Sequence, residues 1–457
     1  MKVTQRLAAF IAETSLEKMP PEVIVLTKRA IIDTVGVALA GSVNPSARAL
    51  AGHANRFGCK PAASIIGSSI MTSSTLAAMV NGFSAHVLDY DDTHDTTQGH
   101  SSAVLVPVVF SLGEEMGSTG KQVIEAYVLG IETWARVSRI MPQFHIKGWH
   151  PSGTLGTVGA AVAAAKLLKL TQEQIVMALG IACSEAAGLI KNFGTTTKPL
   201  HVGNAAKNGI IAALLAKEGF TASGDILEGD TGFPATFYGK GTLDALSIVA
   251  NLGAPFALTH PGLNVKNYPS CYDTHKALDA ILHLITLHDI KPEDVESIEC
   301  HSNPVTMMNL RDTAPATAME ARFSMQFAIS VALTDRKFGL EQVTDGKVND
   351  PIVRALMKRV TLSIHPDWIE GRDTAHNRAD VITVRLKNGR VYRDEVLASR
   401  GSSKNPLTEE ALLEKYRECA GLVFKKEHLE RFINLLGELE KLKDIKNLVQ
   451  TATGSDL

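Results

Sequence analysis

The chain has 457 residues, of which 45% are hydrophobic and 21% charged, and its formal net charge is −2. A chain of this length is expected to form two domains, and the composition is typical of a globular protein. The small net charge gives no electrostatic case for a nucleic-acid or anionic-membrane partner.

The cysteines and the apolar runs lead to expectations about compartment. The five cysteines include no CxxC pair, and their odd number argues against a disulfide framework or a structural zinc site. Residues 1–20 are predicted to form an amphipathic helix, because they lack the continuous apolar run of a signal peptide. Runs such as 156–170 contain lysine and are too short to span a bilayer. We therefore expect a cytoplasmic protein with no membrane-spanning segment.

Helical periodicity dominates the chain from residue 1 to about 260. Apolar residues recur at i, i+3, i+4 and i+7 in six segments, several of which are apolar on almost all sides. Helices of that kind are typically central and wrapped by others. The six segments are 23–39, 74–87, 121–140, 156–168, 172–189 and 204–218.

Near His260-Pro261-Gly262 the pattern changes to mixed helices and strands. Alternation of apolar and polar residues predicts strands at 295–301, 360–365, 381–386 and 391–396. Asn388-Gly389 lies between the last two and predicts a two-residue primed turn. Helices are expected at 274–287, 321–333 and 352–359, and again from Glu409 to the end.

These patterns predict a mainly α fold. A large all-helical domain would comprise residues 1–260 and 400–457. A smaller α+β domain, residues 261–399, would be inserted before the C-terminal helices and cap a cleft as a lid.

Loops between the apolar helices gather proton-transfer groups. The stretch from Lys191 to Gly209 (KNFGTTTKPLHVGNAAKNG) is basic and hydroxyl-rich, and it contains Lys198 and His201. Since helix N-termini favour anions, a basic loop that enters a helix predicts a carboxylate-binding site. The alternative interpretation is a solvated basic loop.

The segment from His86 to Pro107 is rich in aspartate and histidine. Its aspartates could supply oxygen ligands to a divalent metal, or they could form an exposed acidic turn. His100 precedes an apolar helix and is the favoured functional histidine, with His94 as its rival. The aspartates are Asp89, Asp91, Asp92 and Asp95.

Two more loops complete the set. His150 is held between Trp149 and Pro151 before a predicted helix, and Lys266 lies in the stretch 262–275. Lysines on opposite walls of a cleft suit a substrate with two or three carboxylates, and a desolvated lysine can also act as a base. Cys271, in the same stretch, is a possible nucleophile.

The four loops resemble those of the MmgE/PrpD family, which includes 2-methylcitrate dehydratase, cis-aconitate decarboxylase and iminodisuccinate epimerase. The resemblance spans nearly the whole chain in the expected order. It is carried by D-Y-D-D-T at 89–93, G-W-H-P at 148–151, K-P-L-H-x-G-N-A-A at 198–206, K-x-Y-P-S-C at 266–271 and N-P-L-T at 405–408.

The resemblance implies a helical domain with a lid, a homodimer, and chemistry that needs neither a cofactor nor a metal. It implies that two histidines exchange protons, that two lysines hold carboxylates, and that further groups orient them or bind substrate. The catalytic candidates are His150, His100, Lys198, Lys266 and Asp89, and the substrate-binding candidates are Thr93, His201, Cys271 and Tyr272.

The chain also departs from the decarboxylase-like members of the family. Those members carry histidine at the position of Cys271 and tyrosine at that of Phe327, and here one extra residue separates Thr93 from His100. The first two changes remove proton-handling groups, which weakens the decarboxylase interpretation. The S-C-Y-x-x-H form at 270–275 is closer to the epimerase branch.

The reactions of the family share proton chemistry at the carbon next to a carboxylate. We therefore expect a cofactor-independent lyase of the 2-methylcitrate dehydratase type that acts on a small di- or tricarboxylate. The alternatives are an isomerase of the iminodisuccinate epimerase type, a cis-aconitate decarboxylase-like enzyme and a non-catalytic binding protein. The sequence shows no G-x-G-x-x-G after a strand, no P-loop and no H-E-x-x-H motif.

Overall fold

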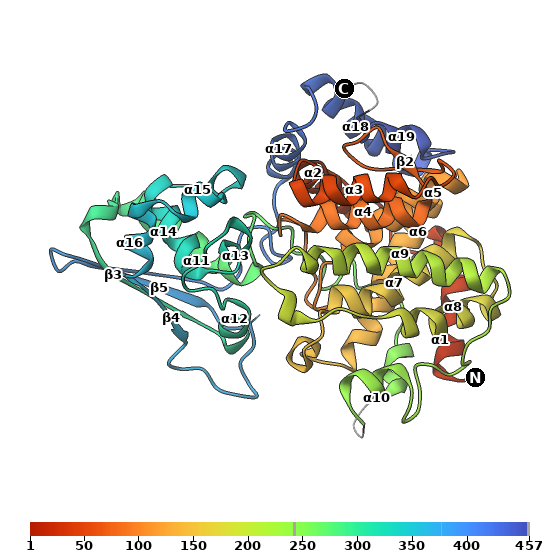
Figure 1. The fold of residues 1–457 in the computed structure, drawn as a ribbon. Coiled ribbons are helices and arrows are strands. Elements are labelled where there is room, and N and C mark those ends of the chain that lie inside the picture. Colours follow the sequence, from red (N-terminus) through yellow and green to blue (C-terminus); the bar gives the residue numbers. More distant parts are fainter. Residues whose placement is uncertain (241–243, 376, 455–457) are drawn as a thin grey trace.

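The computed structural model describes residues 1–240, 244–375 and 377–454. Residue 376 of the predicted lid and residues 455–457 of the predicted helical tail lie outside this description, as do residues 241–243. The chain is mainly α, as predicted, with a large helical part and a smaller α+β part beside it (Figure 1).

The helical part is formed by both ends of the chain. The C-terminal helices return to it, and α17 packs against α2 (Figure 1). Its helices are α1 (Val3–Glu13), α2 (Glu22–Ser42), α3 (Pro45–Arg56), α4 (Ser74–His86), α5 (Ser101–Met116), α6 (Gly120–Arg139), α7 (Pro151–Leu167), α8 (Gln172–Glu185), α9 (Thr197–Lys217), α10 (Phe233–Tyr238), α17 (Glu409–Ala420), α18 (Lys426–Gly437) and α19 (Lys446–Gln450). A two-stranded hairpin, β1 (Ala63–Ser64) and β2 (Met71–Thr72), lies between α3 and α4.

The centre of the helical part is built from α5 and α7, which are buried along almost their whole length. Small residues let the neighbouring helices approach them closely. A Cβ atom on Gly209 of α9 would lie 2.3 Å from the Cβ of Ala160 on α7, so only glycine fits there. Among the described residues, no helix combines the length and the apolar character that a bilayer span requires.

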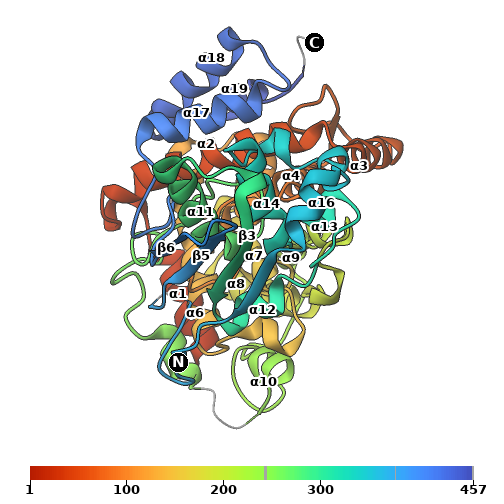
Figure 2. The ribbon, with the colours of Figure 1, turned by 90° about the vertical axis from the view of Figure 1, so that its left-hand side faces the viewer.

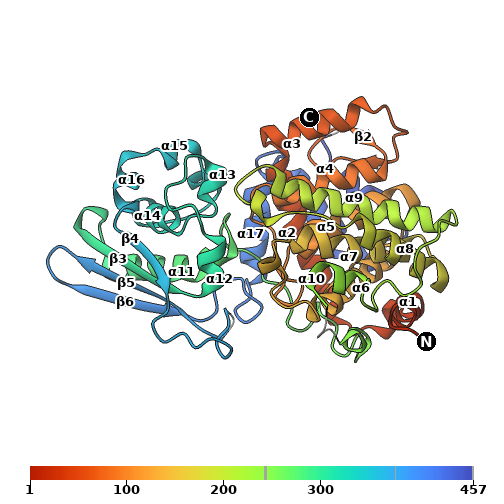
Figure 3. The ribbon, with the colours of Figure 1, turned by 60° about the horizontal axis from the view of Figure 1, so that its bottom comes forward.

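The α+β part holds a four-stranded sheet with the order β4-β3-β5-β6. The β3–β4 pair is parallel, whereas β3–β5 and β5–β6 are antiparallel. Helices α11 and α14 pack against the sheet, which Figures 2 and 3 show from two directions. The elements are α11 (His275–His288), β3 (Val295–Ser302), α12 (Pro304–Asn309), α13 (Ala318–Ala321), α14 (Met325–Asp335), α15 (Asp345–Val348), α16 (Pro351–Met357), β4 (Val360–Ile364), β5 (Asp380–Leu386) and β6 (Val391–Val396).

The strands lie where alternation predicted them, but the hairpin turn differs from the prediction. A two-residue primed turn needs positive φ at both central residues, and Gly389 has φ +84 whereas Asn388 does not have positive φ. Leu386 N donates to Arg390 O at 2.9 Å, so three residues form the loop and the glycine takes the left-handed position. The turn is therefore the three-residue type.

Two segments connect the helical part with the α+β part, and they run side by side. Val265 N donates to Gly401 O at 2.8 Å. Gly401 has φ +90, and a Cβ there would lie 2.0 Å from Val265 O, so the close approach depends on glycine. Gly262 also has positive φ, at +88. These connections bring Lys266 beside the loop that follows α4.

Candidate active site

Three helix N-termini carry predicted site residues. His100 is the N-cap residue of α5 and His150 that of α7, and neither side chain caps its own helix. Lys198 lies in the first turn of α9. The rings of His100 and His150 have centroids 6.5 Å apart. Positive dipole ends of helices near one another favour the binding of an anion.

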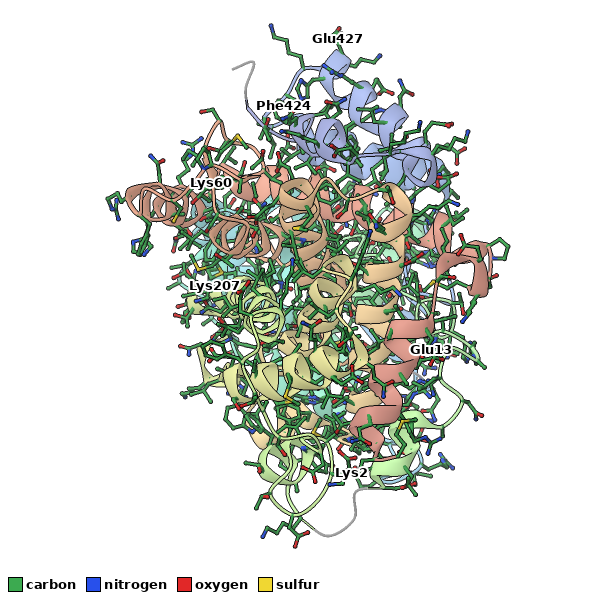
Figure 4. The ribbon with its side chains drawn as sticks, turned by 90° about the vertical axis from the view of Figure 1, so that its right-hand side faces the viewer. Lys2, Glu13, Lys60, Lys207, Phe424 and Glu427 are labelled. Carbon is green, nitrogen blue, oxygen red and sulfur yellow. The ribbon has the colours of Figure 1, made fainter. Side chains whose placement is uncertain are left out.

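The first turn of α9 corrects the predicted helix boundary. The helix begins at Thr197, seven residues before the predicted start at 204, so Lys198 and His201 lie within it. Pro199 is compatible with this start, because a proline in the first turn gives up no intrahelical hydrogen bond. Figure 4 labels Lys207 further along α9, about two and a half turns beyond Lys198.

Asp89 is the centre of the site and binds both predicted lysines. Its Oδ2 accepts a hydrogen bond from Lys198 Nζ at 2.9 Å, and its Oδ1 accepts one from Lys266 Nζ at 2.5 Å. Lys266 also donates to the backbone oxygen of Asp89 at 2.8 Å. All three side chains are buried, and Asp89 adopts a left-handed backbone with φ +51. Such backbone strain is typical of functional sites.

The charges of this centre favour an anionic ligand. Burial alone would raise the pKa of Asp89, but Lys198 and Lys266 lower it well below its ordinary value, so the carboxylate is ionised. One carboxylate thus faces two ammonium groups. Lys198 Nζ also lies 5.0 Å from the ring centroid of Phe193 and 4.7 Å from that of Phe323, which exclude water around it.

Asp91 links two histidines beside this centre. Each of its carboxylate oxygens lies 3.0 Å from Nδ1 of His86, the last residue of α4. Oδ2 also lies 3.0 Å from Nδ1 of His100, although this contact is off the line of a hydrogen bond. Nε2 of His100 lies 3.9 Å from Asp89 Oδ1. His100 therefore stands between the two aspartates.

A second pair of imidazoles, those of His150 and His201, lies close to the rings of His86 and His100. Nδ1 of His150 and Nδ1 of His201 are 3.1 Å apart. Two nitrogen lone pairs do not face each other at this distance, so one of the two atoms carries a proton. The ring of His150 also lies 5.1 Å from the Phe193 ring and 5.9 Å from the His86 ring.

The imidazoles of the site are uncharged at neutral pH. Burial is the main cause, since it disfavours the charged form. The pKa of His86 is lowered to about 3 and that of His201 to about 4. Burial, assisted by Lys198, lowers the pKa of His150 well below its ordinary value, and burial also lowers that of His100. Neutral imidazoles can accept protons, as a general base must.

The other predicted residues lie at the edge of this cluster or beyond it. Thr93 forms an antiparallel bridge with Asn264, and so ties the Asp89 loop to the segment that carries Lys266. Cys271 N donates to Arg322 O at 2.9 Å, and its thiol lies 3.6 Å from Asp273 Oδ2. Burial raises the pKa of this thiol well above its ordinary value, so the nucleophilic thiolate is disfavoured.

Tyr272 points to a neighbouring cavity. Its hydroxyl lies 3.2 Å from Ser399 Oγ, and the side chain lines a pocket together with Asp95, Asn264 and Lys276. No hydrogen bond joins Tyr272 to Asp89 or to the histidines among the described residues. The structure therefore places Tyr272 apart from the Asp89 cluster.

His94, the rival of His100, is engaged in holding its own loop. Its Nε2 lies 2.9 Å from Ala257 O, and its Nδ1 accepts hydrogen bonds from the backbone of Thr96 and Thr97. Both nitrogens are thereby occupied, and the geometry favours His100.

Phe327 does not occupy the position expected from the resemblance. Its side chain is buried in the hydrophobic core of the α+β part, 6.1 Å from the ring of Phe338. Phe323, which precedes it in the chain, is the aromatic residue that contacts Lys198.

Sequence reasoning left several residues of the site without an assigned role. Asp91 and His86 stood within the acidic segment, but nothing in the sequence distinguished them from the neighbouring Asp92 and His94. Arg322 is buried, donates from Nε to Leu88 O at 3.0 Å, and carries no catalytic signature in its sequence context.

A divalent metal is sterically possible but electrostatically disfavoured. His86, Asp89, Asp91 and His100 offer ligand atoms that all lie within 4.8 Å of one another. Asp89, however, is already bound by two ammonium groups, which would repel a dication at the same position. The donor set suits an organic anion better than a metal.

The chain is similar to known proteins over almost its whole length. It is 30% identical over 465 residues to the cis-aconitate decarboxylase of Homo sapiens. The aligned region covers 99% of this chain and 95% of that protein. The enzyme of the same name from Mus musculus is 30% identical over 466 residues, with 99% and 93% covered. That from Aspergillus terreus is 26% identical over 471 residues, with 98% and 95% covered.

These relatives are decarboxylases, which are lyases, and the predicted enzyme class is confirmed to that extent. The model of the MmgE/PrpD N-terminal domain matches residues 5–245, and that of the MmgE/PrpD C-terminal domain matches residues 268–441. The chain therefore belongs to the MmgE/PrpD family.

Proposed function

We propose that the protein is a lyase that acts on a small tricarboxylate by moving a proton at the carbon next to a carboxylate. The observation that carries this proposal is the pairing of Lys198 and Lys266 on Asp89, beside two uncharged histidines. Two buried ammonium groups can hold substrate carboxylates, and neutral imidazoles can take a proton from carbon. The similarity to cis-aconitate decarboxylases supports a tricarboxylate substrate.

Within this class we favour a dehydratase of the 2-methylcitrate type. Cys271 stands where, by the resemblance, decarboxylase-like members have histidine, and its thiol stays protonated. The aromatic residue that contacts Lys198 is Phe323, which has no hydroxyl group, and Phe327 lies in the apolar core of the α+β part. None of the three supplies the missing proton transfer. Dehydration needs a base for the carbon-bound proton and an acid for the departing hydroxyl group. His100 suits the base, and the imidazolium that forms on it can give the proton to the departing hydroxyl group, which leaves as water.

The same residues also support an isomerase as a second candidate. An epimerase removes a proton from carbon and returns one on the opposite face. His100 and His150, with ring centroids 6.5 Å apart, are two separate proton-transfer groups that could lie on opposite sides of such a carbon.

Proton NMR in heavy water distinguishes these reactions. The purified protein is incubated with 2-methylcitrate, with cis-aconitate and with a simple dicarboxylate, and CO₂ release is recorded in parallel. Formation of an olefin with loss of the hydroxyl group supports the dehydratase. Release of CO₂ from cis-aconitate would assign a decarboxylase, and exchange at carbon with unchanged connectivity an isomerase. Absence of all three with every substrate would contradict the proposal.

Closure of the α+β part over the substrate is also proposed. Lys266 lies at the entry to this part, while His100, His150 and Lys198 belong to the helical part. Closure would expel water and strengthen each charge contact in the site. We expect a bound tricarboxylate to slow amide hydrogen exchange in residues 262–275 and around Gly401. Unchanged exchange at a saturating concentration would argue against a moving lid.

Replacement of Cys271 by serine is expected to leave substantial activity. The thiol is protonated and contacts Asp273, so it shapes the site without attacking the substrate. A hydroxyl of similar size keeps this contact, and kcat should stay within about tenfold of the wild-type value. Complete loss of turnover, with a covalent substrate adduct at Cys271 seen by mass spectrometry, would instead identify nucleophilic catalysis.

Chelators are expected to leave the activity unchanged. The two lysines on Asp89 make the site unfavourable for a dication, and proton transfer between carbon and imidazole needs no Lewis acid. The measurement is the initial rate after dialysis against EDTA. Inactivation that is reversed by Mg²⁺ or Fe²⁺ would show that the four metal-compatible side chains do bind an ion.

A further inference from the structure

Asp91 occupies a position that the proposed function does not yet use. Its carboxylate is fully buried and lies between two imidazoles, at 3.0 Å from Nδ1 of His86 and 3.0 Å from Nδ1 of His100. The two rings contact each other edge to face, with centroids 4.2 Å apart. One carboxylate thus fixes a pair of histidines, of which His100 borders the Asp89 centre.

The contact with Asp91 determines the tautomer of His86. Burial opposes ionisation of Asp91, but its two imidazole contacts lower its pKa well below the ordinary value. An ionised carboxylate only accepts hydrogen bonds, so Nδ1 of His86 must be the donor. In the neutral ring Nε2 then holds the lone pair, and this atom is buried without a hydrogen-bond partner among the described residues.

The same reasoning applies to His100. Its Nδ1 lies 3.0 Å from Oδ2 of Asp91 without hydrogen-bond geometry, and the negative charge at this distance favours a proton on Nδ1 and a lone pair on Nε2. That Nε2 lies 3.9 Å from the Asp89 carboxylate, which the two lysines bind. The lone pair is therefore placed where a substrate carboxylate and its neighbouring carbon would be held.

We propose that Asp91 is the positioning residue of proton transfer, and this inference rests on the proposed function. It accepts a hydrogen bond from Nδ1–H of His86 and places its negative charge 3.0 Å from Nδ1 of His100, so that Nε2 of His100 is the atom that takes the proton from the substrate. A carboxylate in this place orients the imidazole and stabilises the imidazolium that forms, as in other acid–base sites.

The charges around His100 make this stabilisation necessary. Several titratable or charged groups face it from every neighbouring element, and the two ammonium groups among them oppose a positive imidazolium. Asp91 is the closest of the negative groups, at 3.0 Å against 3.9 Å for Asp89. The groups are Asp89 and Asp91 from the loop after α4, His86 from α4, His150 from α7, Lys198 from α9, and Lys266 from the connecting segment.

The test compares Asp91→Asn with Asp92→Asn in the full-length protein. The amide that replaces the Asp91 carboxylate would be uncharged and could accept from only one imidazole, so kcat should fall about 100-fold, with a smaller change in KM. Loss of the negative charge lowers the pKa of His100 further, so the acid limb of the kcat profile should move to lower pH. Asp92 serves as the matched control, because it bonds to Ser102 and not to a histidine, and burial raises its pKa to about 8.

Nitrogen-15 NMR of the histidine rings gives a readout that does not depend on turnover. In the wild-type protein His86 and His100 should be Nδ1–H tautomers, and Asp91→Asn should change at least one of them, whereas Asp92→Asn should not. Nε2–H tautomers in the wild-type protein would overturn the inference, even if Asp91→Asn failed to fold. Unchanged kcat and pH profile in a folded Asp91→Asn variant would also overturn it. If the wild-type protein turns over no tricarboxylate, the proposed function is wrong. The ring tautomers of His86 and His100 still test, independently of turnover, where Asp91 places their protons.

Discussion

Replacement of Lys198 by alanine is expected to lower kcat/KM by about 10- to 150-fold, because a charge-assisted contact with a substrate carboxylate contributes about 1.5–3 kcal/mol. Lys198 is 4% exposed, and its ammonium group is held between Asp89 and the rings of Phe193 and Phe323. Little water competes for this ammonium group, so its interaction with an anion is strong. The measurement is steady-state kinetics with the substrate identified by NMR.

The protein should stay folded in this variant. Asp89 keeps its second partner, because Lys266 donates to both its carboxylate and its backbone oxygen. Lys207→Ala is the matched control, since it makes the same change on the same helix and Lys207 is only partly buried. Near-wild-type kinetics for Lys198→Ala would remove Lys198 from the site, and an equal loss in Lys207→Ala would indicate a general effect on α9.

The fold could be predicted where the signal was local. The four strands of the sheet show alternation within single segments, and β5 and β6 flank a turn signal. The start of α9 was wrong because Pro199 and three threonines resemble a loop, whereas tertiary packing of α9 against α4 and α7 continues the helix through them. In such a case tertiary packing outweighs the low intrinsic helix propensity of the residues.

The site could be predicted in part for the same reason. Basic residues beside proline and glycine marked Lys198, Lys266 and His150, since short polar motifs interrupt long apolar helices there. The partnership of Asp89 with two lysines, one from the first turn of α9 and one from the connecting segment, has no local signal. The different partners of Asp91 and Asp92 also have no local signal. The two residues are adjacent in sequence, yet Asp91 faces a histidine pair whereas Asp92 bonds to Ser102.

Replacement of Asp89 by asparagine is expected to reduce both stability and activity. The carboxylate is buried between Lys198 and Lys266, so its removal leaves two ammonium groups close together without a counter-ion. Loss of one partner from a buried ion pair costs about 3–5 kcal/mol. Urea unfolding at neutral pH measures this loss, and turnover should become undetectable because both carboxylate clamps lose their orientation.

The pH dependence of the unfolding free energy provides a second test of the role of Asp89. The two lysines hold the pKa of Asp89 well below its ordinary value in the folded protein. The carboxylate therefore stabilises the fold above the unfolded pKa of about 3.9, and this contribution is lost as the pH falls through the lower folded value. Because asparagine does not titrate, the difference in unfolding free energy between wild type and variant should be full at neutral pH and should shrink at pH values below about 4.

An exposed ion pair provides the control for this last experiment. Arg417 and Glu430 form a pair whose side chains are 40% and 35% exposed, and Glu430→Gln should cost no more than about 1 kcal/mol. A cost for Asp89→Asn as small as that of Glu430→Gln would show that the lysine–aspartate–lysine centre does not stabilise the fold. If the variant is destabilised as expected but still turns over substrate, Asp89 holds the two lysines for stability alone, and a different group must orient them during catalysis.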